Sequence, residues 1–149
     1  MSQANSQPDL KASAQPVPGR LTTHVLDTVK GGPAVGMRIE LYVCEAAPDG
    51  GADADLDGLS AGRWLKLRSV VTNHDGRVDG PLLSGGDFKP GCYRLVFDVA
   101  AYFKAQGAAL PEPAFLGQVP LDFGIADGSS HYHVPLLVSP WSYSTYRGS

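Results

Sequence analysis

Residues 131–149 at the C-terminus read HYHVPLLVSPWSYSTYRGS. The first part of this segment, residues 131–139, is a short, largely apolar run and predicts a buried strand. Aromatic and hydroxyl residues then continue without a break to the final carboxylate, whereas a chain terminus is usually frayed and tolerant of change. We therefore expect the C-terminal end to be packed against another part of the protein.

Short strands separated by Gly, Pro and Asp turns precede this segment. Residues 37–44 alternate with the period of a half-buried strand and carry four apolar side chains on one face: Met37, Ile39, Leu41 and Val43. Similar signals predict further strands at residues 21–27, 64–72, 92–99, 116–125 and 143–147. One short helix is expected at residues 100–106, ended by Gly107. Seven or eight strands at this spacing predict an all-β fold, an antiparallel β-sandwich with one short helix.

Composition narrows the class of protein. The chain has 149 residues and a formal net charge of -3, which favours a single domain without a basic stripe for nucleic acid. No apolar run approaches the roughly 18 residues that a membrane-spanning helix needs. Residues 1–19 are rich in Gln, Ser, Ala and Pro and predict a disordered arm before a domain at residues 20–149. The arm lacks the apolar core of a secretory signal, so a cytoplasmic location is expected. Cys44 and Cys92 could pair, but two thiols in such a chain are more often free.

An acidic segment at residues 46–61 interrupts the strand pattern. Asp53, Asp55 and Asp57-Gly58 match the first half of an EF-hand calcium loop. The twelfth position of that loop is Trp64, where a calcium site needs a bidentate Glu, and no helix is expected on either side. A solvated acidic loop is therefore favoured over a calcium site.

Three of the four histidines lie in predicted strands. His24 lies within the first strand, and a strand histidine taken alone is more often a hydrogen-bonded structural residue. His131 and His133 share one strand face, and such a pair suggests zinc at first sight. No third ligand has a recognisable spacing, so a pair of imidazoles lining a cavity for proton transfer fits better than a metal site.

Other polar residues carry no specific signal when each is considered alone. Arg77 follows the Asp75-Gly76 turn, a dipeptide that supplies the positive φ of a tight turn. By itself Arg77 would be interpreted as a solvated arginine. Tyr146 and Ser149 would be interpreted as terminal packing. Their combination with the histidines is more informative than any of them singly.

Four blocks together resemble the 5-hydroxyisourate hydrolases, the enzymes of urate breakdown in the transthyretin-like family. The blocks are residues 21–27 with 31–34, residues 72–77, residues 93–97 with 101–103, and residues 131–149 ending in YRGS. The resemblance covers residues 21–149 apart from the acidic segment. It implies the transthyretin-like β-sandwich and a homotetramer, a dimer of dimers whose sites open onto a channel across the dimer–dimer interface.

The resemblance also implies roles for individual residues. His24, Arg77 and His133 match positions that are catalytic or bind substrate in the hydrolases, Tyr146 matches a substrate contact, and Ser149 lies near it. The hormone carrier transthyretin shares the fold but lacks both histidines and the YRGS end. The alternative function is therefore a non-enzymatic carrier of a small ligand.

The reaction implied is hydrolysis of 5-hydroxyisourate to 2-oxo-4-hydroxy-4-carboxy-5-ureidoimidazoline. His24 and His133 are expected to act as the acid–base pair that activates water, and Arg77 to steady the developing oxyanion. Tyr146 would orient the ring and Ser149 would position the water. No metal or organic cofactor is expected.

Overall fold

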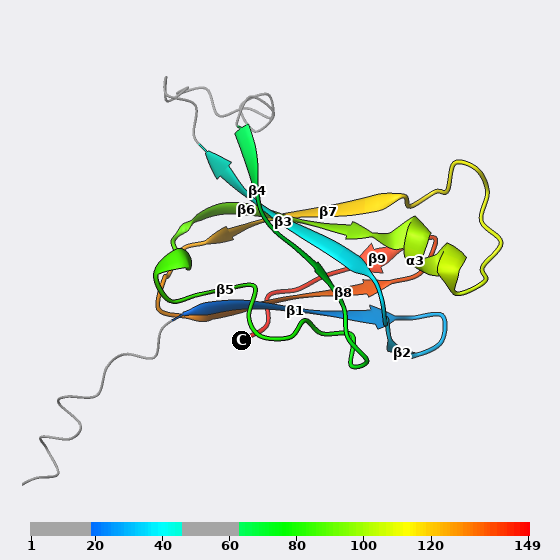
Figure 1. Ribbon diagram of the computed structural model, residues 1–149, viewed down its shortest axis with the longest axis horizontal. Coiled ribbons are helices and arrows are strands. Elements are labelled where there is room, and N and C mark those ends of the chain that lie inside the picture. Colours follow the sequence, from blue (N-terminus) through cyan, green and yellow to red (C-terminus); the bar gives the residue numbers. More distant parts are fainter. Residues whose placement is uncertain (1–18, 46–62) are drawn as a thin grey trace, which may run out of the picture.

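Two β-sheets packed face to face form the domain, in a computed structural model that describes residues 19–45 and 63–149 (Figure 1). The first sheet has the order β2-β1-β8-β9, with β5 beside β1, and consists of β2 (Gly32–Pro33), β1 (Arg20–Asp27), β8 (His131–Val138), β9 (Tyr143–Ser144) and β5 (Leu83–Ser84). The second has the order β4-β3-β6-β7 and consists of β4 (Arg63–Val71), β3 (Arg38–Glu45), β6 (Gly91–Asp98) and β7 (Gln118–Ile125). The all-β sandwich predicted from the strand pattern is confirmed.

One strand pair departs from the antiparallel pattern. β1 and β8 run parallel along their whole length, from Arg20 opposite His131 to Asp27 opposite Val138. The other paired strands within the described ranges are antiparallel. The parallel pairing sets which side chains of β1 and β8 are neighbours, and it becomes important for the site described below.

The short elements differ slightly from their predicted bounds. The helix α3 spans Val99–Ala105, one residue earlier than predicted, and a 3₁₀ turn, η1, covers Gly85–Asp87. The last strand, expected at residues 143–147, is shorter because β9 ends at Ser144. The hydroxyl of Thr145 then donates to the carbonyl of Pro135 at 2.6 Å, and the chain rejoins β8 only at Gly148.

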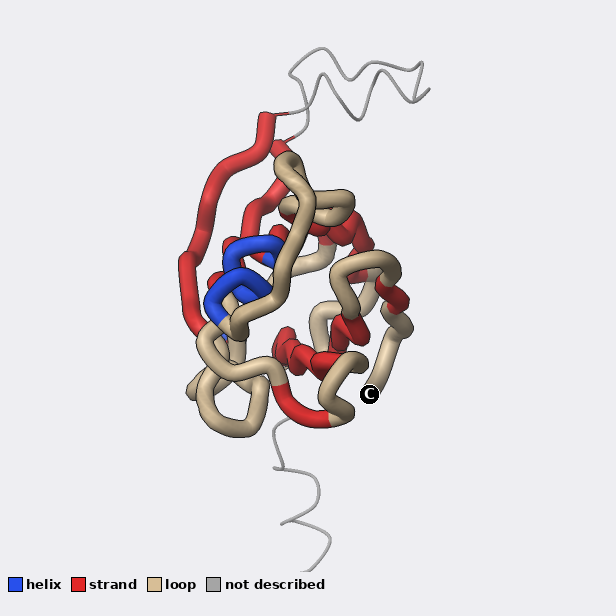
Figure 2. The backbone as a smooth tube through the Cα atoms, turned by 90° about the vertical axis from the view of Figure 1, so that its right-hand side faces the viewer, coloured by secondary structure: helices blue, strands red, loops and turns tan. Residues whose placement is uncertain are grey.

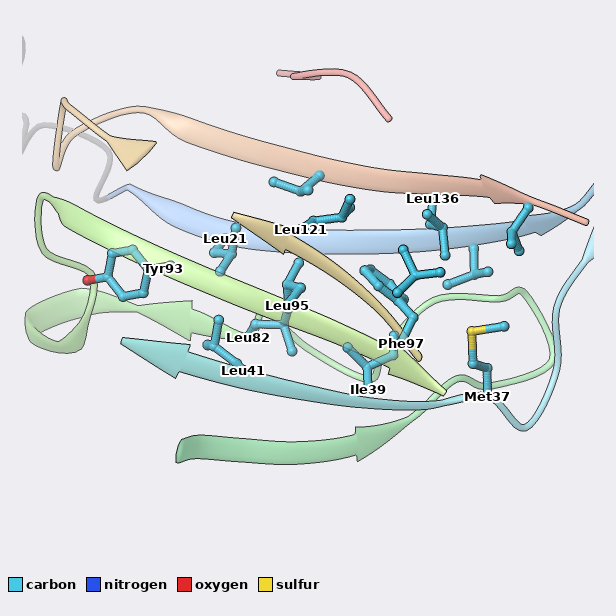
Figure 3. Packing of buried hydrophobic residues seen from close by; sticks show 14 of the residues in the cluster. Leu21, Met37, Ile39, Leu41, Leu82, Tyr93, Leu95, Phe97, Leu121 and Leu136 are labelled. Carbon is cyan, nitrogen blue, oxygen red and sulfur yellow. The ribbon is translucent and has the colours of Figure 1, made fainter. Parts of the chain in front are cut away.

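Apolar side chains from both sheets form a single core (Figure 3). Leu21 and Leu136 of the first sheet meet Ile39, Leu95 and Phe97 of the second, and each is at most 1% exposed. The alternation predicted for residues 37–44 is confirmed in β3, where the inward positions from the start of the strand are buried and Val43 is partly buried. The opposite face of each sheet remains available for other contacts.

The N-terminal arm and the acidic segment, including the half EF-hand, lie outside the described residues. Gly19, which the sequence assigns to the arm, is buried, and a Cβ there would collide with the ring of Phe88. Only glycine leaves room for this ring at position 19. Neither helical element within residues 19–45 and 63–149 has the length and apolar character that a bilayer crossing requires.

Candidate active site

Three histidines lie on the outer face of the first sheet. His24 of β1 and His131 and His133 of β8 are half-buried, while their neighbours along each strand point into the core. The parallel register places His133 opposite Thr22 and places Pro135 opposite His24. The two histidines expected to form the acid–base pair therefore lie on adjacent strands, offset by two residues and on the same face.

The hydroxyl of Thr22 lies between the two histidine rings of β8. Its Oγ1 is 2.7 Å from Nε2 of His131 and 2.8 Å from Nδ1 of His133. Both distances are those of good hydrogen bonds. The ring centroids of the two histidines are 6.2 Å apart, which is the separation that a bridging hydroxyl allows.

A tight turn brings Arg77 beside His24. The turn is closed by hydrogen bonds from the Gly76 amide to the Asn73 carbonyl (2.9 Å) and from the Asn73 amide to the Arg77 carbonyl (2.7 Å). Gly76 has φ of +73°, and a Cβ there would lie 2.5 Å from the carbonyl oxygen of Val25, so glycine is required. The Asp-Gly turn predicted from the sequence is confirmed, and Arg77 forms a β-bridge with His24.

The C-terminal residues return to the same face and lie against His133. The amide of Gly148 donates to the His133 carbonyl at 2.7 Å, and the His133 amide donates to the Gly148 carbonyl at 3.2 Å. A Cβ on Gly148 would lie 3.1 Å from Cβ and Cδ2 of His133. The guanidinium of Arg147 lies over the ring of Tyr132, 4.3 Å from its centroid. Figure 2, which looks along the long axis, shows this segment on the outer side of the molecule.

The expectation that the terminus is packed is met only in part within one chain. Gly148 is in close contact with His133, but Tyr146 is 59% exposed and Ser149 is also exposed. The backbone near the end is held, while the two side chains expected to serve the substrate face outward. Arg77 is exposed as well.

Burial and nearby cations keep the imidazoles neutral. The pKa of His133 is lowered by burial first, then by the positive charges of Arg77 and of the neighbouring histidines. The pKa of His24 is also lowered by burial and then by Arg77, with the Asp75 backbone carbonyl acting in the opposite direction. Neutral imidazoles can accept a proton near neutral pH, which suits a general base.

The three histidines are not gathered into one cluster of ligands. Across residues 19–45 and 63–149, no group of three His, Cys, Asp or Glu side chains is arranged to hold a metal ion. His131 and His133 each direct one ring nitrogen to Thr22. The arrangement is that of a polar, cation-bearing surface suited to proton transfer.

Two residues of this surface were missed in the sequence interpretation, Thr22 and Gly148. Thr22 precedes His24 by two residues and so shares its strand face, which is a signal present in the sequence. Its role as a bridge depends on pairing with a strand more than a hundred residues away. The contact between Gly148 and His133 likewise depends on where the chain returns.

The domain is thus a two-sheet β-sandwich with three histidines and an arginine on the outer face of one sheet. The sequence profile of the HIUase/Transthyretin family matches residues 21–148, and the chain belongs to this family. The family expected from the four sequence blocks is thereby confirmed.

Known proteins similar to this chain include two enzymes and a transthyretin in complex with thyroxine. A 5-hydroxyisourate hydrolase of Pseudomonas aeruginosa is 54% identical over 142 residues, covering 94% of this chain and 100% of the relative. The crystal structure of an (S)-allantoin synthase superposes with a TM-score of 0.75 and 44% identity, covering 89% of this chain but 44% of that one. Sea bream transthyretin in complex with thyroxine superposes with a TM-score of 0.68 and 29% identity, covering 87% of this chain and 94% of that one.

Proposed function

We propose that this protein hydrolyses 5-hydroxyisourate to 2-oxo-4-hydroxy-4-carboxy-5-ureidoimidazoline, a step of purine breakdown. The observation that carries the proposal is the placement of His24, His133 and Arg77 on one face of the first sheet. High identity to a hydrolase over nearly the whole chain supports the choice of substrate. The reaction needs no metal or organic cofactor, because all its proton transfers fall to side chains of the protein.

The mechanism uses the two imidazoles as an acid–base pair. One takes a proton from the attacking water and the other gives a proton to the leaving ring nitrogen, each typically worth about 10²–10⁴ in rate. The lowered pKa values of His24 and His133 suit the base, because a neutral ring must be present to accept the proton, whereas the partner ring must already be an imidazolium when it gives a proton to the leaving nitrogen. Arg77 stabilises the developing oxyanion through its guanidinium fork. Tyr146 orients the substrate ring, and Ser149 positions the water.

The proposal includes a homotetramer, a dimer of dimers, with the outer face of β1 and β8 turned toward a neighbouring subunit. Exposed aromatic residues support this assembly, since Phe115 (66% exposed) and Trp141 (59%) pair at 6.1 Å and Tyr146 is 59% exposed. A facing subunit would cover these rings and enclose the site. Size-exclusion chromatography with light scattering tests the assembly, and a monomer at working concentration would contradict it.

A cytoplasmic location also belongs to the proposal. Cys44 and Cys92 are both free, as thiols of a reducing compartment usually are. Fractionation of cells that produce the full chain, with activity measured in each fraction, tests this location.

Following the ultraviolet absorbance of 5-hydroxyisourate tests the reaction. Urate oxidase generates the substrate in the cuvette, and its decay is compared with and without the protein. We expect decay well above the spontaneous rate, lowered about a hundredfold or more in His133→Ala and in His24→Ala. The matched control is His74→Ala, because the His74 side chain is 86% exposed in the turn. Near-normal turnover in both site variants would contradict the assignment of the acid–base pair.

The rival function is that of a small-ligand carrier, favoured by the likeness to transthyretin bound to thyroxine. A carrier needs a binding channel but no acid–base pair. Decay at the spontaneous rate in the presence of a folded tetramer would favour this function over hydrolysis.

A further inference from the structure

The hydroxyl of Thr22 connects His133, which the proposed mechanism uses, to His131, which it does not. The two contacts, 2.7 Å to Nε2 of His131 and 2.8 Å to Nδ1 of His133, make a continuous chain of three polar groups across β1 and β8. The strand register holds this chain in place, because Thr22 lies directly opposite His133 and Arg20 opposite His131. None of the three side chains can leave this hydrogen-bonded row without a change of rotamer.

Counting protons limits how this chain can be arranged. A threonine hydroxyl donates one hydrogen bond and accepts up to two, while a neutral imidazole has one N–H and one bare nitrogen. Thr22 Oγ1 makes no other hydrogen bond within the described part of the chain. A fully bonded chain of neutral rings therefore has one ring nitrogen donating to Thr22 and the other accepting from it. The tautomers of His131 and His133 are coupled through the hydroxyl.

We propose that Thr22 and His131 are positioning residues that hold His133 in the tautomer with its proton on Nδ1, leaving Nε2 bare to accept the proton of water. In this arrangement Nδ1–H of His133 donates to Thr22, and the hydroxyl of Thr22 donates to Nε2 of His131. The inference rests on the proposed hydrolysis. The opposite direction would place the proton on Nε2 of His133 and remove the lone pair that a base needs.

The proposed direction also survives the catalytic cycle. When Nε2 of His133 takes a proton from the attacking water, the ring becomes an imidazolium whose Nδ1–H still donates to Thr22. When the Nε2 proton is later released to solvent, the starting tautomer returns. The three side chains keep their positions throughout, so no reorganisation accompanies proton transfer.

The direction depends on a neutral His131, because only a bare Nε2 can accept from Thr22. The charged groups that face His131 are Arg20 of β1 and Arg147 of the C-terminal segment, and on its own strand His133 lies two residues away. Burial and these two arginines lower the pKa of His131, so the ring is neutral at neutral pH. The charge of Arg147 also interacts with that of Asp127, in the turn before β8. Protonation of His131 at acidic pH would reverse its hydrogen bond to Thr22.

Imidazole nitrogen NMR of the uniformly ¹⁵N-labelled full chain tests the tautomer without substrate. At slightly alkaline pH, we expect His133 to show a protonated Nδ1 and a bare Nε2. Thr22→Val keeps the shape of the side chain but removes the hydroxyl, and it should shift His133 toward the Nε2–H form. Thr22→Ser restores the hydroxyl and should restore the tautomer. A protonated Nε2 on His133 in the wild-type protein would overturn the proposal.

Kinetics of 5-hydroxyisourate decay test whether the hydrogen bonds of Thr22 with His131 and His133 serve catalysis. We expect Thr22→Val and His131→Phe each to lower kcat by about tenfold or more, less than the loss in His133→Ala, with KM changed far less. Thr22→Ser should recover most of the rate. Thr28→Val is the matched control, because the Thr28 hydroxyl donates to the Val138 carbonyl at 3.1 Å, at the far end of β1.

The outcomes separate this inference from the proposed function. Unchanged kcat in both Thr22→Val and His131→Phe, with an active wild-type enzyme, would overturn the positioning role and leave the hydrolase in place. A wild-type protein with the expected tautomer but no hydrolysis would overturn the proposed function and, with it, the catalytic role of the hydrogen bonds at Thr22. If Thr22→Val fails to fold, His131→Phe gives the same comparison.

Discussion

Replacing Gly148 by alanine tests whether the contact between the C-terminus and His133 serves activity. A Cβ at this position would lie 3.1 Å from Cβ and Cδ2 of His133 and 3.4 Å from its Cγ. Contacts of 3.1 Å are tighter than ordinary van der Waals separations, so the segment must move by a few tenths of an ångström. That movement strains the two backbone hydrogen bonds between these residues, at 2.7 Å and 3.2 Å.

The size of the effect follows from those two bonds. Each hydrogen bond contributes about 0.5–1.5 kcal/mol net, so weakening the pair costs about 1–2 kcal/mol of docking free energy. About 1.4 kcal/mol is a factor of ten in the docking equilibrium. We therefore expect kcat/KM for 5-hydroxyisourate to fall by about tenfold. The free energy of unfolding should change little, since Gly148 contributes nothing to the core.

Amide hydrogen exchange and kinetics together measure the prediction. The amide of His133, which donates to Gly148, should exchange faster in Gly148→Ala, in step with the loss of activity. Gly124→Ala is the matched control, because a Cβ there meets no atom within 4 Å. Wild-type activity in Gly148→Ala despite rapid exchange at His133 would refute the reasoning, because the terminus would then be dispensable for catalysis.

The remaining predictions concern pH, charge and the core. Because the pKa values of His24 and His133 lie below the usual value of about 6.5, the acid limb of kcat/KM, which reports protonation of the base, should lie below that pH. The same pKa shifts affect the free energy of unfolding, because the unfolded chain binds protons at these histidines more readily than the folded protein does. Their contribution to stability is therefore complete above about pH 6.5 and is progressively lost as pH falls toward the pKa values of the folded state. Urea titrations across this pH range would measure the loss. Arg77→Gln removes a cation that lowers both pKa values, so the acid limb of the rate profile should move to higher pH; an unmoved limb would contradict the electrostatic argument. Ile39→Ala, in the sheet away from the site and 1% exposed, should lower the free energy of unfolding by about 2–5 kcal/mol in urea at fixed protein concentration, with the turnover of folded protein unchanged.

Local pattern was sufficient to predict the longer strands, but it missed the two-residue strands β2 and β5. The alternation around Ile39 and Leu41 predicted the buried face of β3, and the Asp75-Gly76 pair predicted the turn that holds Arg77. Such signals can be recognised in sequence because they depend on residues two to four apart, whose relation is set by backbone geometry. The length of the last strand was overestimated, because β9 ends at Ser144 and the hydroxyl of Thr145 then donates a hydrogen bond to the carbonyl of Pro135.

The candidate residues His24, Arg77 and His133 could be named from the sequence through the family resemblance. Composition and spacing alone left His24 and Arg77 with an ordinary structural interpretation, and only His133, through its pairing with His131, suggested proton transfer. Their assembly on one face depends on the parallel pairing of β1 with β8 and on the bridge between His24 and Arg77. Neither pairing has a signal in local hydrophobic periodicity, since the paired strands are far apart in the chain.

The sequence by itself determined the fold class, the family and the residues that could carry acid–base chemistry. Only the tertiary structure decided that Thr22 lies between His131 and His133, across sequence separations of 109 and 111 residues, and that Gly148 lies against His133. The physical reason is that strand alternation fixes which face a side chain occupies, whereas its partner across the sheet is set by register and topology, which emerge only when the whole core packs.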